Sequence, residues 1–398
     1  MRHLLLKLVV VILCITSCQP KPKELTTAST SPFSTTLVIG KRDTITSKVL
    51  NEERPIIISL PKDYNKNNAN YPVLYLTDGQ QNIQHAMGTI EVLTRTGSMP
   101  PVIVVGIESI DRGRDFTPTK NENSPNSGNG PSYLKFIESE LIPYIESSYR
   151  THPFRILEGH SMGGLFAAYT LMEKPELFDA HIIMSPSLWW NNEESTERAK
   201  AFFKEQPNLK SAIFFGIGTM ESSKEWGMRK ELTSFIEAIK VNQPKNLRFE
   251  HRELEGEGHM SSPLLSNYYG LKFIFSDMAL PSALVNDFNE DIFLKHEQHI
   301  MTKYGSQAKQ SAEAYVNLVF RLINKEQFKD AITVIQRSIE AYDYDIWLRN
   351  LLASTYEKNN QITEAIEAYK AAIDVSKKYK FGKEAEFQGH IDRLIKIE

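Results

Sequence analysis

One stretch decides the fold of this chain: Phe154-Arg155-Ile156-Leu157-Glu158-Gly159-His160-Ser161-Met162-Gly163-Gly164-Leu165. Its apolar start, residues 154–157, predicts a short strand, and residues 162–172 predict a helix because they are small or apolar and contain no proline. Ser161 lies between them, with Gly159 and Gly163 two positions away on either side. Larger neighbours would collide on a sharp strand-to-helix turn, so the pattern indicates a nucleophile elbow. The N-terminus of the helix favours negative charge beside the serine.

Apolar, β-branched runs recur on both sides of this stretch and predict further strands, at residues 37–39, 55–60, 71–76, 101–107, 178–184, 212–217 and 247–254. Continuous apolar runs are typical of strands that are buried on both faces, as in a parallel sheet covered by helices. Helices are predicted between the strands, at residues 132–148, 226–241 and 268–275. The alternation predicts an α/β fold with a mostly parallel sheet flanked by helices, and it resembles the α/β-hydrolase fold.

After about residue 276 the chain becomes rich in helix-forming residues and self-similar. Lys329-Asp330-Ala331-Ile332 recurs 34 residues later as Thr363-Glu364-Ala365-Ile366. A 34-residue period with a small residue where two helices cross resembles the tetratricopeptide repeat. We therefore expect a small all-α domain with repeats at 312–345 and 346–379. Such repeats form binding surfaces, so a protein partner is expected there rather than chemistry.

The N-terminus has the features of a secretory signal. Arg2 and Lys7 supply positive charge, residues 8–13 are apolar, and small residues precede Cys18. The arrangement resembles the bacterial lipobox, which implies cleavage before Cys18 and lipidation of its thiol; an ordinary signal peptide with an incidental cysteine is the alternative. We expect a protein of the bacterial cell envelope that a lipid anchors to the membrane, in the periplasm or at the cell surface.

Composition excludes several classes of function. The formal net charge is −3, and no basic surplus suggests nucleic acid as a partner. Both cysteines, Cys14 and Cys18, lie in the leader, so the body of the protein has no thiol for a disulfide, a thiolate nucleophile or a cysteine metal site. We expect neither a metal nor an organic cofactor.

A serine hydroxyl is a weak nucleophile that needs a base within hydrogen-bond reach and a group that orients the base. In α/β-hydrolases the chain order is nucleophile, acid, histidine. His259, in the glycine-bearing stretch after the last predicted strand, is the candidate base. Glu221, after the strand before it, is the candidate acid, and Glu225 is the second choice. Alternatively, Glu221 caps the next helix and the site works as a Ser–His dyad.

Other histidines have structural interpretations. His160 lies next to the nucleophile, but we expect its side chain to point away from the site. His181 lies in a predicted buried strand, where a hydrogen-bonded core histidine is expected.

An oxyanion hole needs two backbone N–H groups aimed at the developing charge. Met162, directly after the nucleophile, supplies one. Gln80, in the turn after the strand at 71–76, is the candidate for the other, and Gly79 before it permits a close approach of the backbone to a ligand. An ordinary β-turn at 78–80 is the alternative.

Aromatic and basic side chains are candidates for substrate binding. Trp189, Trp190 and Trp226 could line a pocket for an aromatic group, and core packing is equally compatible with any one of them. Arg112 and Arg114 could meet an anionic substrate, or they could pair with acids such as Asp115.

Four segments together resemble the putative esterase family: 71–79, 159–164, Ser185-Pro186-Ser187-Leu188-Trp189-Trp190 and 256–259. The family includes siderophore esterases, feruloyl and acetyl xylan esterases, S-formylglutathione hydrolases and mycolyltransferases. The third segment and Arg-Gly-Arg-Asp-Phe-Thr at 112–117 are most similar to the siderophore esterase branch. The resemblance implies a serine carboxylic-ester hydrolase that uses Ser161, His259 and Glu221 and forms an acyl-enzyme. This chain departs from the family in two ways: it has a glutamate at 221, where feruloyl esterases tend to have aspartate, and it carries the appended repeats. Both departures weaken any inference of a particular substrate from the family.

The sequence leaves several functions open. The same residues would serve the hydrolysis of siderophore esters, of other small esters, or of feruloylated or acetylated polysaccharides. They would also serve acyl transfer to an acceptor other than water. A binding lipoprotein whose repeats recruit a partner is a further alternative. We predict a signal peptide at 1–17, a flexible tether at 18–32, an α/β-hydrolase esterase domain at 33–278, a linker helix at 279–311 and tetratricopeptide-like repeats at 312–398.

Overall fold

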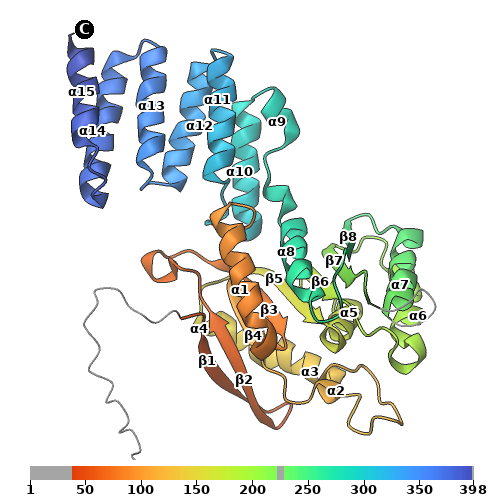
Figure 1. Ribbon diagram of the computed structural model, residues 1–398. Helices are drawn as coiled ribbons and strands as arrows, with labels where there is room; N and C mark the ends of the chain where they lie inside the picture. Colours follow the sequence, from red (N-terminus) through yellow and green to blue (C-terminus); the bar gives the residue numbers. More distant parts are fainter. Residues whose placement is uncertain (1–37, 222–227, 397–398) are drawn as a thin grey trace, which may run out of the picture. The chain divides into compact units, whose positions relative to one another are not determined.

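The computed structural model describes residues 38–221 and 228–396, and in this part of the chain eight strands form one sheet (Figure 1). The strand order is β1-β2-β4-β3-β5-β6-β7-β8. β2 is antiparallel to both β1 and β4, and all other neighbours are parallel. The strands are β1 (Lys41–Ser47), β2 (Glu52–Ser59), β3 (Tyr71–Thr77), β4 (Ile103–Ile107), β5 (Thr151–His160), β6 (Ala180–Met184), β7 (Ser211–Gly218) and β8 (Leu247–Leu254).

Helices cover both faces of the sheet. One face packs against α1 (Gly79–Arg95) and α8 (Ser262–Ile274). The other face packs against α3 (Gly130–Phe136), α4 (Ile142–Ser148), α5 (Met162–Glu173), α6 (Trp190–Glu205) and α7 (Met228–Asn242). A π-helical turn, Ile137–Leu141, joins α3 to α4, and a short α2 (Arg112–Asp115) lies in the loop after β4. The mostly parallel, doubly covered sheet confirms the predicted α/β-hydrolase fold.

Successive residues of the central strands enter different cores. In β3, Val73 and Tyr75 belong to the core beneath α5, whereas Leu74 and Leu76 belong to the core beneath α1. All seven residues of β3 are buried, as expected for a strand without a solvent face. Truncating one of these side chains to alanine costs about 2–5 kcal/mol of stability in a packed core.

Two local predictions were wrong. The strand expected at 37–39 is absent from its described residues, because Val38 and Ile39 lie outside any strand; the edge strand is β1 instead, whose polar outer face hid it. The turn expected at 78–80 is the start of the 17-residue helix α1, whose first turn carries three amides and no apolar residue before Ile83.

The chain beyond α8 is helical. Its elements are α9 (Ser282–Asn286), α10 (Glu290–Tyr304), α11 (Ala312–Asn324), α12 (Phe328–Ala341), α13 (Ile346–Lys358), α14 (Ile362–Tyr379) and α15 (Glu384–Ile395). α11 and α13 begin 34 residues apart, and so do α12 and α14. Apolar side chains of these helices form two cores of their own. The assignment to the tetratricopeptide repeats and the domain boundaries stay predictions.

The linker helix α10 ends against the α/β core. The ring of Tyr304 lies 4.9 Å from that of Phe154 at the start of β5, and its hydroxyl donates to Asp277 over 2.6 Å. Lys303 pairs with the same carboxylate at 2.5 Å. These contacts tie the end of α10 to the strand that carries the elbow.

The predicted signal peptide, the tether and Cys18 lie outside the described residues. Within the described residues, no helix combines the length and the apolar character that crossing a membrane requires. The same part of the chain contains no cluster of three or more His, Cys, Asp or Glu side chains that could hold a metal ion.

Candidate active site

The elbow lies between β5 and α5, and its backbone is strained. Ser161 has φ 60° and ψ −116°, a conformation that non-glycine residues adopt rarely and mostly at functional sites. A Cβ on Gly159 would lie 2.1 Å from the carbonyl oxygen of Gly163. A Cβ on Gly163 would lie 2.4 Å from Oγ1 of Thr77 at the end of β3. The two glycines are therefore required by the space around the turn.

Of the three residues predicted as a triad, the histidine lies within hydrogen-bond distance of both the serine and the acid. Nε2 of His259 is 3.1 Å from Oγ of Ser161, and Nδ1 of His259 is 2.8 Å from Oε2 of Glu221. The serine follows β5, the acid follows β7, and the histidine follows β8, so all three stand at the carboxyl edge of the sheet. Glu225 and Trp226 lie outside the described residues.

The carboxylate of Glu221 is buried and held on both oxygens. Its Oε1 accepts hydrogen bonds from the Ser185 hydroxyl at 2.6 Å and from the Gly218 N–H at 2.8 Å. Burial alone would raise the pKa of Glu221, but the hydrogen bonds from His259, Ser185 and Gly218 outweigh it and lower this pKa. The acid is therefore ionised and fixed in orientation, as a group that aligns an imidazole must be.

The two predicted oxyanion donors lie at the N-termini of two helices, and these helices follow the neighbouring strands β3 and β5. Met162 is the first residue of α5 and Gln80 the second residue of α1. The N–H groups of a first helical turn have no acceptor within their helix, so both are available to a ligand. The hypothetical Cβ of Gly163 would also lie 3.5 Å from a carboxylate oxygen of Asp78, so the two turns are in close contact.

Asp78 is the N-cap of α1 and holds the first turn of this helix, which carries Gln80. Its backbone is left-handed, with φ 53° and ψ 45°. Its Oδ1 accepts hydrogen bonds from the Ser109 hydroxyl at 2.5 Å and from Nε of Arg112 at 2.8 Å. Oε1 of the Gln80 side chain accepts a hydrogen bond from the backbone N–H of Ser109 at 3.0 Å. The loop after β4 thus fixes the loop after β3.

The structure separates the two arginines proposed for substrate binding. Arg112 lies beside the elbow, with 40% of its side chain exposed and Nη2 3.4 Å from the carbonyl oxygen of His160. Arg114 does not reach the site, because it forms ion pairs with Glu52 and Asp115 around the fully buried Arg54. Its interpretation as a substrate ligand is replaced by the structural alternative.

The two tryptophans are separated in the same way. Trp189 lies in the segment after β6, and 45% of its surface is exposed. Trp190 is buried, and its indole N–H donates a hydrogen bond to the carbonyl of Thr119 at 3.2 Å. Trp190 is therefore a core residue and not a ligand for substrate.

Sequence reasoning missed two contacts. The ring of His160 does not point away; its centroid lies 4.5 Å from that of His259. Burial, and secondarily His259, lowers the pKa of His160 to about 4, so it is a neutral neighbour of the base. Ser187 places its hydroxyl 3.3 Å from that of Ser161. Both residues stand in segments that the sequence marked, but nothing local predicted their contacts.

His181 also differs from expectation. It is fully buried in β6, yet neither ring nitrogen has a hydrogen-bond partner among the described residues. Burial lowers its pKa to about 3, so the ring is neutral.

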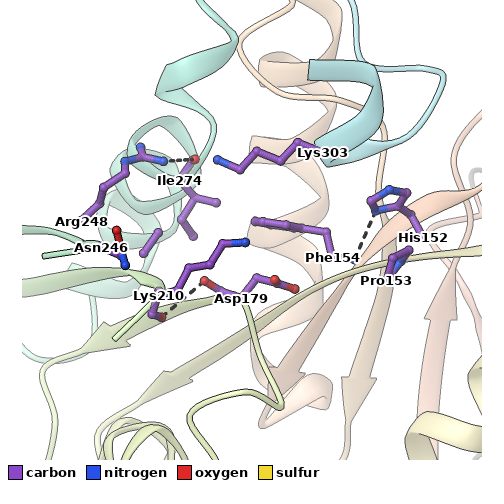
Figure 2. A pocket seen from close by; sticks show the side chains of 11 residues that line it. His152, Pro153, Phe154, Asp179, Lys210, Asn246, Arg248, Ile274 and Lys303 are labelled. Atoms are coloured by element: carbon purple, nitrogen blue, oxygen red, sulfur yellow. Dashed lines mark hydrogen bonds between the residues drawn. The ribbon is translucent and has the colours of Figure 1, made fainter. Parts of the chain in front are cut away.

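A hollow of about 300 Å³ lies at the opposite edge of the sheet, near the starts of β5, β7 and β8 (Figure 2). Lys210 and Lys303 reach into it (Figure 2). Arg248 in its wall already donates to the carbonyl of Phe273 at 2.7 Å, and Lys303 pairs with Asp277. The hollow is remote from the triad, which stands where the same strands end.

Comparison with known proteins shows the family. The family model described as Putative esterase matches residues 47–261, more than half of the chain. The ferri-bacillibactin esterase BesA of Bacillus subtilis (strain 168) is 31% identical over 216 residues, which cover 48% of this chain and 75% of BesA. The chain belongs to the Putative esterase family. It is therefore an esterase that acts on carboxylic esters.

Solved structures extend the likeness beyond the matched region. An IroE-like serine hydrolase from Shewanella oneidensis is 25% identical with a TM-score of 0.61, covering 76% of this chain and 99% of that one. An uncharacterised protein from Capnocytophaga ochracea DSM 7271 shares the fold with a TM-score of 0.63 at 15% identity, over 89% of this chain and 99% of that one. Because 89% of the chain exceeds the length of the α/β domain, the second likeness includes part of the C-terminal helices.

Proposed function

We propose that this esterase works through a covalent acyl-enzyme on Ser161, with His259 as general base and acid and Glu221 as the orienting acid. The observation that carries the proposal is the chain of two hydrogen bonds, 3.1 Å and 2.8 Å long, that runs from the serine hydroxyl through the imidazole to the carboxylate. A neutral imidazole that donates Nδ1–H to Glu221 presents the lone pair of Nε2 to the serine proton.

Acylation begins when Oγ of Ser161 attacks the carbonyl carbon of the ester and its proton passes to Nε2 of His259. The tetrahedral intermediate collapses, the bond to the alkoxy oxygen breaks, and the imidazolium returns the proton to the leaving alcohol. Water then attacks the acyl group with the same base, and the carboxylic acid leaves with Ser161 restored. Glu221 stays ionised throughout and stabilises the imidazolium.

The backbone N–H groups of Gln80 and Met162 donate hydrogen bonds to the oxyanion of each tetrahedral intermediate and stabilise its negative charge. A donor of this kind contributes roughly 3 kcal/mol to transition-state stabilisation, and the positive ends of α1 and α5 act in the same direction. The clamp of Asp78 by Ser109 and Arg112 keeps the first donor in place before the substrate arrives.

Siderophore esters are the substrate class that we propose. The support is the likeness to BesA, which is named for ferri-bacillibactin, and the half-exposed Arg112 guanidinium beside the nucleophile, which suits a substrate with anionic or acceptor oxygens. The Ser-Pro-Ser-Leu-Trp-Trp segment, which resembles the same branch, adds to this support, and its Ser185 and Ser187 contact the acid and the nucleophile.

The deciding experiment compares Ser161→Ala with wild type in two assays. We expect turnover of p-nitrophenyl butyrate to fall at least about 10⁴-fold and covalent labelling by a fluorophosphonate to disappear. Ser139→Ala, which removes an exposed hydroxyl in the π-helical turn between α3 and α4, is the matched control and retains both. Undiminished turnover in Ser161→Ala would exclude the triad.

A substrate panel tests the specificity part separately. We expect a ferric catecholate triester to be cleaved faster than feruloyl or acetyl-sugar esters. A preference for the sugar esters would assign the chain to the polysaccharide esterases while leaving the triad in place.

The cellular context is proposed from the sequence alone. We propose that Cys18 carries a lipid that anchors the protein in the cell envelope and that the C-terminal helices recruit a protein partner. Cys18→Ser should move the protein from the membrane fraction to the soluble fraction; unchanged fractionation would contradict the anchor.

A further inference from the structure

Exposed apolar side chains gather at the edge of the sheet that carries the triad. Between β1 and the end of α8, seven large apolar residues among those described are exposed. Two of them, Val92 and Val241, lie on the outer surfaces of α1 and α7. The other five follow strand ends or begin α8, and we call them the apolar rim: Ile110, Trp189, Met220, Met260 and Leu264. Exposed apolar side chains that gather at one edge of a fold are typical of binding sites.

The two methionines of the rim sit directly beside the catalytic candidates. Met220 precedes Glu221 and Met260 follows His259, and their exposed fractions are 75% and 69%. The two loops are joined, because the Met220 N–H donates to the carbonyl of Glu257 at 3.0 Å. A Cβ on Gly218 would lie 2.2 Å from the same carbonyl oxygen, so the two loops approach each other closely at this glycine. Both methionines are therefore open to solvent, in two joined loops that also carry the candidate acid and base.

The remaining members extend the rim around the nucleophile. Trp189 follows Ser187, whose hydroxyl is 3.3 Å from that of Ser161. Ile110 follows Ser109, which is bonded to the oxyanion turn through Asp78. Leu264 stands in the first turn of α8, just after the loop of the base.

We propose that the apolar rim binds an extended aromatic or alkyl body of the ester and makes the enzyme selective for bulky apolar esters over small ones. The inference rests on the proposed function, because the rim lies at the edge of the sheet that carries the serine which the ester must reach. Occupation by substrate is favoured because the rim residues stand at the sheet edge that carries Ser161 and His259, and two of them are chain neighbours of Glu221 and His259. Methionine and tryptophan suit this role, since thioethers adapt to irregular apolar shapes and both contact aromatic rings favourably.

The expected size of the effect follows from burial of apolar surface. Each methylene that leaves water contributes about 0.8 kcal/mol, which is roughly a fourfold gain in binding. A body that covers both methionines therefore gains at least about tenfold over an acetyl group, and replacing both by serine removes most of this gain.

The test measures kcat/KM for p-nitrophenyl octanoate and p-nitrophenyl acetate in wild type, the double variant Met220→Ser/Met260→Ser and the control Val241→Ser. We expect the octanoate-to-acetate ratio to fall about tenfold in the double variant and to stay within twofold of wild type in the control, whose side chain is equally exposed but lies on α7. Equal losses on both esters, or no loss on either, overturn the proposal.

A binding measurement separates this inference from the catalytic proposal. In the Ser161→Ala background, calorimetric titration with hexananilide, an amide analogue, should show about tenfold weaker binding after Met220→Ser/Met260→Ser. That loss is expected even if Ser161 proves not to be the nucleophile. If hexananilide binds equally well and the double variant instead loses self-association or binding to phosphatidylglycerol vesicles, a second copy or a lipid surface occupies the rim and the proposal is wrong.

Discussion

Ser185 donates its hydroxyl proton to Oε1 of Glu221 over 2.6 Å, on the carboxylate oxygen that His259 does not contact. The serine is fully buried at the end of β6, with a left-handed φ of 40°, and its hydroxyl is also 3.0 Å from that of Ser262. Contacts on both oxygens prevent the carboxylate from rotating away from the imidazole. The segment after β6 therefore supports the acid as well as flanking the nucleophile.

Ser185→Ala tests this support. A hydrogen bond to a charged group is worth about 1.5–3 kcal/mol, so we expect kcat to fall on the order of tenfold or more, with KM little changed. Steady-state kinetics on p-nitrophenyl butyrate measure both constants. Ser139→Ala controls for the loss of a hydroxyl, and wild-type kcat in Ser185→Ala would show that Gly218 and His259 hold the acid by themselves.

Glu221→Gln asks whether the site is a triad or a dyad. The amide presents either an N–H or a weaker acceptor to Nδ1, which favours the wrong tautomer of His259, and the equivalent change in a serine protease lowers kcat about 10⁴-fold. We expect a loss of about 10³-fold or more, with partial activity in Glu221→Asp because the shorter acid keeps the charge. A pH–rate profile accompanies the measurement. Full activity in Glu221→Gln would leave only the Ser–His pair.

Asp78 is predicted to act on catalysis without touching substrate. Asp78→Ala removes the acceptor of Ser109 and Arg112 and places alanine in a left-handed conformation, so the turn with Gln80 loosens. We expect kcat to fall about 10²-fold with a smaller effect on KM. Asp78→Asn, which keeps one acceptor oxygen and tolerates this backbone, should restore much of the activity. Equal losses in both variants would point to the charge of Asp78 rather than to its hold on the turn.

Local patterns were enough for the fold and for the proximity of the triad. The glycines around Ser161 are required by clashes within the turn itself, so they are visible in the sequence. His259 and Glu221 were predicted from the order nucleophile, acid, histidine along the chain and from their positions after predicted strands. Neither step needs the order of strands in the sheet.

Contacts between neighbouring strands could not be predicted in this way. Ser185 meets Glu221 because β6 lies beside β7, and His160 meets His259 because the base returns across three strands from β8 to β5. Arg114 differs from Arg112 because it pairs with Glu52 on β2, the strand beside β4, and with Asp115, which also pairs with the buried Arg54. Such partners depend on topology, for which the sequence carries no local signal.

Glu158 provides a test of stability against pH. It lies in β5 directly before the elbow and is fully buried; its Oε2 accepts the side-chain N–H of Asn267 at 2.7 Å, and its Oε1 has no partner among the described residues. Burial raises its pKa to about 8, and the bond from Asn267 opposes this only in part. The folded protein therefore holds a proton here across neutral pH.

The sign of the pH dependence follows from this proton. Below the ordinary pKa of 4.5, both the folded and the unfolded chain are protonated at Glu158, and the group does not oppose folding. Between there and about pH 8 only the folded chain keeps the proton, so stability falls as pH rises, by up to about 1.4 kcal/mol per pH unit. Glu158→Gln, which keeps an acceptor for Asn267, removes this term.

We therefore expect Glu158→Gln to be as stable as wild type near pH 4.5 and clearly more stable at pH 8, by several degrees in Tm. Urea and thermal unfolding at both pH values measure the difference. Glu205→Gln, at the exposed end of α6, is the matched control and should leave the pH dependence unchanged. An equally steep fall in stability in Glu158→Gln would mean that the carboxyl ionises within the folded protein and that another group produces the slope.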